Sequence, residues 1–394
     1  MRILHVTPSF YPAWAYGGIP RCAYELCRSL VRLGETVTVW TTDALDAQHR
    51  VRTRHATVDG MEISYFPNLS NRLAYHRQLY LPLGLRTHAR RRVADFDVVH
   101  VHSHRHLLQP LVTRPARRNG VPYVFTGNGT VPPFERYLSV KHLLDVLGAR
   151  AILRQAAACI AVSRVERQHY VDAGVRAERV HVIPNGIRLD EFACLPPRGG
   201  FRSANGFGDA PLVLFVGKIT PRKGVDVLLR ALARLPANVH LAIAGNFMMN
   251  PDPIHALVRD LGIGERVRFV GFLSGNDKLA AYVDADVVAY PSAGEIFGLV
   301  PFESLMCGTP AVVCDDSGCG EVLQAAAGGL LVPYGDPQAL AGALQTLLQD
   351  RQRHAACVAS GRRYVAEHLG WDRIAQQTLG LYRTVLAAKV STPV

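Results

Sequence analysis

The chain has 394 residues, 48% of them hydrophobic and 19% charged, which fits a globular protein of two domains. No apolar run approaches the roughly 18–20 residues of a membrane-spanning helix, and the opening residues predict a strand rather than a signal peptide. The eight cysteines have no metal-like spacing, so we expect reduced thiols, no disulfide framework and a cytoplasmic location.

The net charge of +12 is concentrated in the first half of the chain. Residues 1–195 contain 26 Lys and Arg against 15 Asp and Glu, a net +11, whereas residues 196–394 contain 18 against 17, a net +1. This asymmetry indicates an anionic partner for the first half: a membrane surface, a phosphorylated acceptor or nucleic acid. Arginines on an ordinary solvated surface are the alternative.

Short apolar runs rich in β-branched residues alternate with helical patterns in the first half, as in strands buried on both faces of a parallel sheet. Pro20–Leu33 is one such helix, with Pro20 in its first turn and Gly34 at its end. The predicted strands are Ile3–Thr7, Val37–Thr41, Val98–His102, Tyr123–Thr126 and Cys159–Val162.

The same alternation restarts after residues 196–210, a Pro- and Gly-rich segment that we predict to be a linker. We therefore expect an α/β protein with a first domain at 1–195, a second at 211–370, and a closing amphipathic helix at 371–394. The strands predicted for the second domain are Leu212–Val216, His240–Ala244, Val267–Phe269, Val287–Tyr290, Ala311–Cys314 and Leu330–Val332.

Ligands of open parallel sheets bind beyond the carboxyl ends of the strands, where loops lead into helices. Gly17 and Gly18 follow the first strand and precede the Pro20 helix, so backbone N–H groups there could approach an anion. The absence of a Gly-x-Gly-x-x-Gly pattern argues against a dinucleotide-dependent dehydrogenase.

Two further glycine-containing loops occupy this position in the second half. Gly217–Gly224 follows a predicted strand and contains Lys218 and Lys223, which could stabilise a leaving diphosphate. A solvated basic turn is the alternative for this loop. Gly245 follows the strand His240–Ala244 and is included in the predicted donor site.

The segment Pro291–Glu303 carries the strongest signal. Glu295 lies in the loop after a predicted strand, Pro301 fits the first turn of the next helix, and Glu303 lies in that helix. The backbone N–H groups of Phe297, Gly298, Leu299 and Val300 lie between the two carboxylates at the positive end of the helix dipole, which predicts an anion site flanked by acceptors for sugar hydroxyls. The alternatives are dipole compensation for Glu303 and a solvated loop acid for Glu295.

Asn128 and Asn185 follow predicted strands and are further candidates, although asparagines are common in turns. The Asp-x-Asp patterns at 95–97 and 284–286 precede their strands, so we interpret them as helix-to-strand turns and not as metal ligands. His100, His102 and His104 alternate on one face of a strand end and predict a polar lining of the cleft, since a metal site would need further ligands.

The run PSAGEIFGLVPFESLMCGTPAVV, with its two glutamates eight positions apart, resembles the donor-site signature of the retaining GT-B glycosyltransferases of family 4. The resemblance covers nearly the whole chain. Gly17-Gly18 matches the family's first glycine-rich loop, and Gly217–Gly224 matches its "GR…KG" segment. Pro184–Gly186 matches its "PNG" turn, and Trp371 with Tyr382 matches its closing helix.

This resemblance implies two facing Rossmann-like domains, with the closing helix crossing back onto the first. It implies that Glu295 binds the hydroxyls of the donor sugar and Glu303 the ribose, while Lys218 and Lys223 neutralise the diphosphate. Gly17 and Gly18 would close on the donor from the other domain. The family needs neither metal nor cofactor, and it retains the anomeric configuration by same-face attack, with the departing phosphate oxygen helping to take the acceptor's proton.

Two departures from the family pattern stand out. Lys218 replaces a frequent Arg, which keeps the charge but loses the bidentate fork. Asn128 replaces a frequent His, and an amide hydrogen-bonds a hydroxyl but carries no proton at neutral pH. The second departure bears on the rate and on the choice of donor sugar.

The resemblance implies transfer of a hexose-type sugar to a glycan or lipid-linked acceptor in cell-surface polysaccharide or glycolipid synthesis. The leucine- and tyrosine-rich segment Leu73–Leu85, followed by Arg86 and Arg90–Arg92, suits peripheral binding to the anionic inner face of the plasma membrane. A partly buried segment is the alternative. Competing functions are a sugar-nucleotide epimerase or hydrolase, a non-catalytic sugar-nucleotide binder and a nucleic-acid-binding protein, the last of which leaves the glutamate pair unexplained.

Overall fold

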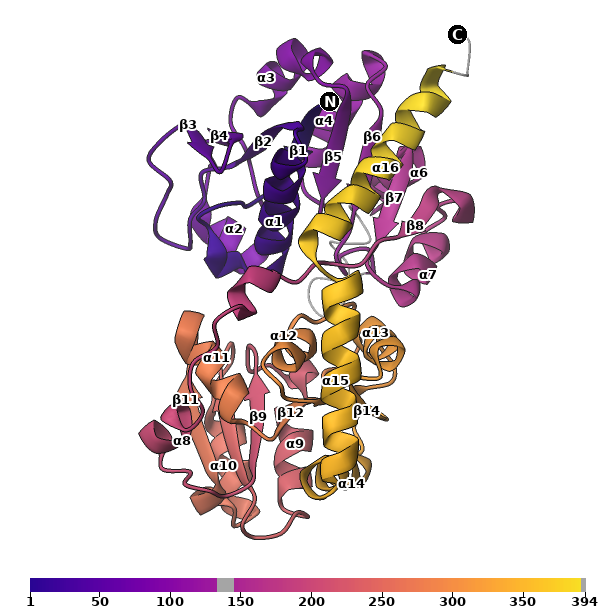
Figure 1. Ribbon diagram of the computed structural model, residues 1–394. Coiled ribbons are helices and arrows are strands. Elements are labelled where there is room, and N and C mark those ends of the chain that lie inside the picture. The colour runs from indigo at the N-terminus through magenta and orange to yellow at the C-terminus, as the bar shows by residue number, and fades with distance from the viewer. Residues whose placement is uncertain (133–144, 391–394) are drawn as a thin grey trace. The chain divides into compact units, whose positions relative to one another are not determined.

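The computed structural model describes residues 1–132 and 145–390. The chain forms two compact units (Figure 1): Met1–Gly186 with Trp371–Val394 is unit 1, and Ile187–Gly370 is unit 2. Each unit is a twisted sheet of mainly parallel strands covered by helices, which confirms the predicted α/β architecture.

Unit 1 contains, within the described residues, an eight-stranded sheet in the order β3-β4-β2-β1-β5-β6-β7-β8. Neighbouring strands are parallel except at the edge, where β3 and β4 form an antiparallel pair. The central strands are buried on both faces, as their continuous apolar runs require. The strands are β1 (Arg2–Val6), β2 (Thr36–Thr42), β3 (His55–Val58), β4 (Met61–Phe66), β5 (Val98–His102), β6 (Tyr123–Thr126), β7 (Ala158–Ala161) and β8 (Val180–Val182).

The helices of unit 1 follow the predicted alternation with strands. They are α1 (Gly18–Arg32), α2 (Asn71–Arg77), α3 (Leu85–Arg92), α4 (Leu108–Arg118), α6 (Arg150–Gln155), α7 (Arg164–Asp172) and α16 (Trp371–Val390). The apolar faces of α2, α3, α4, α6 and α7 pack with the sheet in a buried cluster, and α1 packs against α16.

The closing helix α16 belongs to unit 1 and lies along α1 (Figure 1). Nη2 of Arg32 lies 2.7 Å from Oδ1 of Asp372, and the side chain of Tyr382 is fully buried. The predicted return of this helix to the first domain is therefore confirmed, with residues 391–394 outside the described part of the chain. No described helix is both long enough and apolar enough to cross a bilayer.

Unit 2 contains, in its described residues, a six-stranded parallel sheet in the order β11-β10-β9-β12-β13-β14. The strands are β9 (Leu212–Val216), β10 (His240–Ala244), β11 (Val267–Gly271), β12 (Val287–Tyr290), β13 (Ala311–Cys314) and β14 (Gly329–Val332). The helices are α8 (Gly200–Asn205), α9 (Val225–Leu232), α10 (Asp252–Asp260), α11 (Gly275–Asp284), α12 (Val300–Met306), α13 (Gly318–Ala326), α14 (Pro337–Gln349) and α15 (Arg351–His368).

The linker predicted at residues 196–210 is wrong, because this segment folds as part of unit 2 and contains α8. Its backbone and its two arginines find partners at the end of α11 and just before β12. The N–H of Gly199 donates to Asp284, and the guanidinium of Arg202 binds Asp286 at 2.7 Å. The change of unit falls at Gly186–Ile187 instead of near residue 195.

The same contacts confirm the interpretation of the two Asp-x-Asp patterns as turns. Asp284 ends α11 and Asp286 precedes β12, and both carboxylates are used in structural hydrogen bonds. Asp97 accepts from the N–H of Arg2 at 2.7 Å, just before β5. These acids therefore fix helix-to-strand connections at the amino ends of the strands.

Candidate functional site

Glu295 lies in the loop between β12 and α12, at the carboxyl edge of the unit 2 sheet. Its Oε2 accepts hydrogen bonds from Ser292 Oγ at 3.0 Å and Tyr290 Oη at 3.2 Å, and it forms an ion pair with the ammonium group of Lys223. Its Oε1 accepts no hydrogen bond from the described residues. The carboxylate is thus fixed through Oε2, while Oε1 is available to accept a hydrogen bond from a ligand.

Lys223 follows β9, the strand next to β12, and reaches across to the same site. Its Nζ donates to Tyr290 Oη at 2.5 Å and lies 4.5 Å from the centre of the Tyr290 ring. Burial alone would raise the pKa of Glu295, but the charge of Lys223 and its hydrogen bond lower it, and the net effect is a pKa below the ordinary value. Glu295 is therefore an ionised acceptor at neutral pH.

Lys218 lies at the end of β9, and its side chain keeps a solvent-exposed surface. Partial burial and the nearby charge of Lys223 lower its pKa. Two ammonium groups held close together favour an anion between or beside them, since the anion relieves their repulsion. This is the charge arrangement that a diphosphate requires.

Gly217 and Gly245 end the neighbouring strands β9 and β10, and their backbones touch. A Cβ added to Gly245 would lie 1.8 Å from the carbonyl oxygen of Gly217, and Gly245 has a φ of 149°. The glycine at 245, predicted as a donor contact, has a packing reason of its own. The absence of a side chain at 245 lets the end of β10 lie against the end of β9, which leads into Lys218.

The loop into α12 presents unused backbone donors. Among the described residues, the N–H groups of Phe297, Gly298 and Leu299 donate to no protein acceptor, and α12 has no side-chain cap. Gly298 has a φ of 68°, and a Cβ there would lie 3.0 Å from Sγ of Cys319. The α12 helix begins at Val300 with Pro301 in its first turn, as predicted, and these donors are available for an anion near Glu295.

Glu303 lies in the first turn of α12, and both of its carboxylate oxygens have partners from α11. Tyr282 Oη donates to Oε2 at 2.9 Å, and Nζ of Lys278 lies 3.0 Å from Oε1. The structure thus positions Glu303 by pairing it with Lys278 and Tyr282. A ribose hydroxyl there would share an oxygen with one of these donors.

In unit 1, the predicted glycine loop begins α1. Gly17 is the N-cap of the helix at a φ of 107°, a conformation that favours glycine, and it provides no side-chain cap. A Cβ on Gly18 would meet nothing within 4 Å. A side chain at position 18 would therefore meet no neighbour in the described chain, so Gly18 has no packing reason of its own.

Asn128 follows β6 in a tight turn and has a φ of 50°, in the left-handed region. Its Oδ1 is buried and has no hydrogen-bond partner in the described residues. Asn128 and Asn185 line one cavity of about 20 Å³, which is room for a water molecule or a hydroxyl group. Two of the predicted candidates of the first domain, Asn128 and Asn185, thus lie around one cavity, whereas Gly17 and Gly18 do not line it. Its wall is partly polar, from His100, His102, Thr126 and Thr378, and otherwise mainly apolar.

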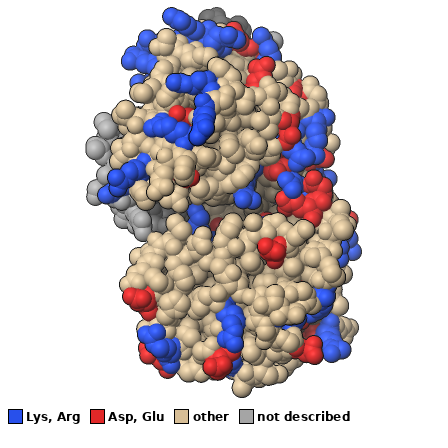
Figure 2. Space-filling view, turned by 90° about the vertical axis from the view of Figure 1, so that its left-hand side faces the viewer, with Lys and Arg blue, Asp and Glu red and all other residues tan. Residues whose placement is uncertain are grey.

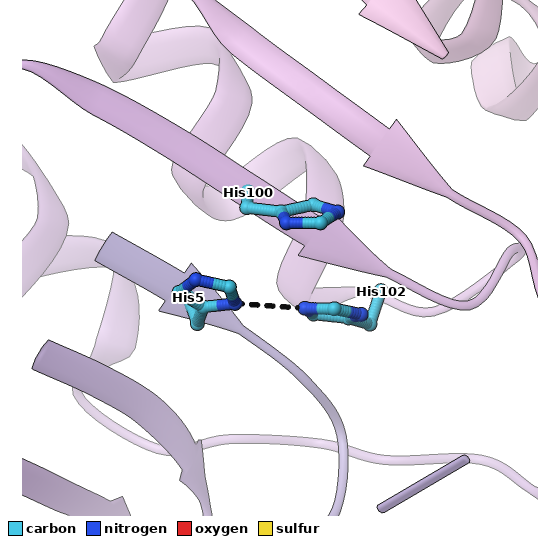
Figure 3. A group of neighbouring side chains, drawn as sticks. All are labelled: His5, His100 and His102. Atoms are coloured by element: carbon cyan, nitrogen blue, oxygen red, sulfur yellow. Dashed lines mark hydrogen bonds between the residues drawn. The ribbon is translucent and has the colours of Figure 1, made fainter. Parts of the chain in front are cut away.

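Three buried histidines lie next to this cavity (Figure 3): His5 on β1, and His100 and His102 on β5. Nδ1 of His5 and Nε2 of His102 are 2.9 Å apart, so one imidazole donates to the other. His100 uses both nitrogens, with Tyr382 Oη at 2.5 Å and Thr126 Oγ1 at 2.7 Å. Burial lowers the pKa of His102 to about 3 and depresses the pKa of the other two, so all three are neutral.

The ring geometry of this cluster suits hydrogen bonding better than metal binding. The nitrogens lie within 4.8 Å of one another, but the rings of His100 and His102 stack with centroids 4.2 Å apart and planes inclined by 29°. A histidine binds a metal in the plane of its ring, and stacked rings direct their lone pairs side by side instead of toward one point. That the reaction needs no metal ion stays a prediction.

His104 was predicted to share the face of His100 and His102, and this is wrong. After β5 the chain turns, and His104 packs edge-on against Phe125, while His5 takes the third place in the cluster. The register of β1 against β5, which pairs His5 with His100, sets this arrangement. That pairing joins residues 95 positions apart and has no local signature.

The chain resembles known proteins over its whole length. Residues 16–191 match the family model described as "Glycosyltransferase Family 4", and residues 200–364 match "Glycosyl transferases group 1". The D-inositol 3-phosphate glycosyltransferase of Jonesia denitrificans is 31% identical over all of this chain and 97% of its own length. The enzyme of the same name from Xylanimonas cellulosilytica is 31% identical over 97% of this chain and 95% of its own.

The chain belongs to glycosyltransferase family 4.

Solved structures show the same fold. Anabaena Alr3699/HepE in complex with UDP has a TM-score of 0.77 at 21% identity, covering 98% of this chain and 100% of its own. The sucrose-phosphate synthase of Thermosynechococcus elongatus has a TM-score of 0.74 at 24% identity, covering 98% and 99%. The family 4 glycosyltransferase described here therefore has the GT-B fold.

In this glycosyltransferase, the sequence motifs identified the backbone loops and the charged groups of unit 2, but not the tyrosines that hold them. Tyr290 bonds Lys223 and Glu295, and Tyr282 bonds Glu303. Tyr290 is the last residue of β12, directly before the signature loop. This position next to Glu295 in the sequence could have indicated its role. Glu166, which binds the turn around Asn128, was also missed, although its Ser-x-x-Glu spacing is visible in the sequence.

Proposed function

We propose that this glycosyltransferase transfers a hexose from a nucleoside diphosphate sugar to a phosphorylated acceptor, with retention of the anomeric configuration and without a metal ion. The Glu295 carboxylate carries this proposal, because it is ionised, is fixed by Lys223 and Tyr290, and has one oxygen that accepts no hydrogen bond within residues 1–132 and 145–390. A sugar hydroxyl that donates to this oxygen would orient the hexose beside the cations and backbone donors that receive the diphosphate.

The chemistry follows from the charges at this edge of unit 2. The acceptor oxygen bonds to the anomeric carbon while the bond from that carbon to the phosphate oxygen breaks. The departing phosphate oxygen takes the acceptor's proton. Lys218, Lys223 and the N–H groups of Phe297–Leu299 stabilise the charge that builds up on the diphosphate. Asn128 would hydrogen-bond a sugar hydroxyl, since its Oδ1 has no partner among the described residues.

The positive charge of the first half of the chain supports a phosphorylated acceptor. Two relatives are named for D-inositol 3-phosphate, and phosphorylated headgroups also occur on lipid-linked glycan acceptors. In the lipid-linked case, the reaction belongs to glycolipid or cell-surface polysaccharide synthesis.

A thermal-shift screen against a panel of sugar nucleotides tests the donor part of this proposal. One nucleotide sugar should raise the melting temperature of the wild type and leave Glu295→Ala unshifted. Glu265→Gln is a matched control, because Glu265 is an exposed acid at the other end of the sheet. Breakdown of the donor without acceptor at the rate seen with acceptor would instead indicate a hydrolase or epimerase, and binding without transfer would indicate a non-catalytic binder.

A second proposal concerns the membrane. Leu69, Leu73, Leu79 and Leu83 are exposed in one stretch of unit 1, with exposed fractions of 40–61%. The exposed arginines of α3, Arg86 and Arg90–Arg92, follow directly in the chain, and Lys and Arg side chains are spread over one face of unit 1 in Figure 2. Apolar side chains beside arginines favour an anionic bilayer surface.

Liposome flotation tests this second proposal. Binding should increase with the fraction of anionic lipid, fall with salt, and weaken in Leu79→Asp and in a triple Arg90–Arg92→Gln variant. Binding that is indifferent to both lipid charge and salt would contradict a peripheral location on the inner face of the plasma membrane.

A further inference from the structure

Helix α7 begins with Ser163 as its N-cap and Glu166 three residues later, the pattern of a capping box. The serine behaves as expected, since its Oγ accepts from the N–H of Glu166 at 3.1 Å. Glu166 does not behave as the glutamate of a capping box. In a capping box its carboxylate returns to the N–H of the N-cap residue, whereas here it bonds two other backbone groups.

The two oxygens of Glu166 join the ends of two neighbouring strands. Oε2 accepts from the N–H of Val162, just after β7, at 2.7 Å. Oε1 accepts from the N–H of Gly129, in the turn after β6, at 2.5 Å. The side chain is fully buried, so no water competes for these bonds.

Tyr170 lies one turn further along α7 and holds the other side of the same turn. Its Oη accepts from the N–H of Gly127 at 2.6 Å and donates to the carbonyl of Ile160 at 3.1 Å. The fit is close: a Cβ on Gly127 would lie 2.9 Å from Tyr170 Oη and 3.2 Å from Glu166 Oε1. Glu166 and Tyr170 of α7 therefore accept hydrogen bonds from the residues on both sides of Asn128.

Asn128 lies between these contacts in a left-handed conformation and lines the cavity. Its buried Oδ1 has no partner in the part of the chain that the structure describes. The left-handed conformation costs a non-glycine residue free energy and persists when the surroundings enforce it. The N–H groups of Gly127 and Gly129 donate to α7 on either side of Asn128, and Thr130 donates to the Gly127 carbonyl within the turn.

We propose that Glu166 is a positioning residue for glycosyl transfer, which holds the Asn128 amide in place through the N–H of Gly129, with Tyr170 assisting through Gly127. This inference rests on the proposed function, in which Asn128 hydrogen-bonds a sugar hydroxyl. Glu166 acts on the reaction only through Asn128.

A double-mutant cycle between Glu166 and Asn128 tests this role. Glu166→Gln places an amide N–H₂ opposite one of the two backbone donors and so breaks one bond. We expect kcat to fall about tenfold, as for the loss of one buried hydrogen bond, with the donor KM changed less than twofold. In the Asn128→Ala background the same substitution should lower kcat less than twofold.

Tyr170→Phe provides a second variant that deletes only the hydroxyl group and keeps the ring. Its effect on kcat should likewise disappear in the Asn128→Ala background. Glu178→Gln is the matched control, because Glu178 is exposed and pairs with the exposed Arg176. Amide hydrogen exchange of Gly129 gives a readout without turnover, and it should accelerate at least tenfold in Glu166→Gln but not in the control.

Effects of Glu166→Gln and Asn128→Ala that multiply would overturn the positioning role while leaving the proposed function intact. Unchanged exchange at Gly129 would overturn it as well. Asn128→Ala with wild-type kinetics would remove both the role of Asn128 and this inference. Absence of transfer from any sugar nucleotide in the wild type, by contrast, contradicts the proposed function itself.

Discussion

Lys223 and Glu295 lie 72 positions apart in the sequence and form an ion pair at the carboxyl edge of the unit 2 sheet. The pairing of β9 with β12 brings their loops together, and Tyr290 contacts both side chains. In the donor-free chain, the ammonium group thus fixes the carboxylate. When a diphosphate binds, the same cation is available to share its charge with the phosphate oxygens.

Removing the carboxylate at 295 should abolish transfer. Glu295→Ala leaves Lys223 and Tyr290 without their common acceptor and the donor sugar without its partner. We expect kcat/KM to fall at least about a hundredfold, which corresponds to roughly 3 kcal/mol of transition-state stabilisation. Initial rates measured beside Glu265→Gln check this, and a variant within threefold of wild type would contradict the role of Glu295.

Lys218 should contribute to donor affinity through its charge. Lys218→Ala should weaken binding of the nucleoside diphosphate about tenfold or more, whereas Lys218→Arg should keep or improve it, because a guanidinium binds phosphate with two parallel hydrogen bonds. Titration calorimetry at two salt concentrations measures both affinities. Equal affinities for Lys218→Ala and the wild type would mean that this lysine does not face the diphosphate.

Gly245→Ala should destabilise unit 2. Its Cβ would lie 1.8 Å from the Gly217 carbonyl oxygen, so the strand ends must separate. A cost of about 2 kcal/mol or more is expected from the overlap and from the unfavourable φ. Chemical denaturation measures this cost, and Gly200→Ala, where a Cβ meets nothing within 4 Å, should change little.

Stability should depend on the ionisation of Glu166. Burial raises its pKa from 4.5 to about 7, despite the hydrogen bonds from Gly129 and Val162. Between these values the folded chain keeps a proton that the unfolded chain releases. The stability linked to this group is therefore full below pH 4.5 and is lost as the pH rises through 7. The nearby Tyr170 and Cys159 stay neutral in this range, since burial raises the pKa of both.

Urea denaturation of wild type and Glu166→Gln from pH 4.5 to 7.5 measures this linkage. The free energy of unfolding of the wild type should fall relative to the variant by on the order of 3 kcal/mol across the range. Parallel pH profiles of the two proteins would mean that Glu166 is ionised throughout in the folded chain.

The parts of the site that were predictable from the sequence are those with a local pattern. Each of these parts lies in a loop that follows an apolar run and precedes a helix, as for Glu295, the Phe297–Leu299 donors and Lys218. Because the strands are parallel, such loops lie at the same edge of the sheet. The contacts of Arg202 with Asp286 and of His5 with His102 depend on long-range packing. The Gly- and Pro-rich composition of 196–210 predicted a linker because composition does not show the contact by which Arg202 holds this segment to unit 2.

The anomeric configuration of the product is the most direct test of retaining transfer from a nucleotide sugar held by Glu295. The wild type is incubated with the nucleotide sugar found by thermal shift, labelled at its anomeric carbon, and with phosphorylated inositols or phosphate-bearing lipid acceptors. NMR of the first product formed should show the configuration of the donor, and Glu295→Ala should give no signal. An inverted configuration, or a product formed by Glu295→Ala at the wild-type rate, would contradict it.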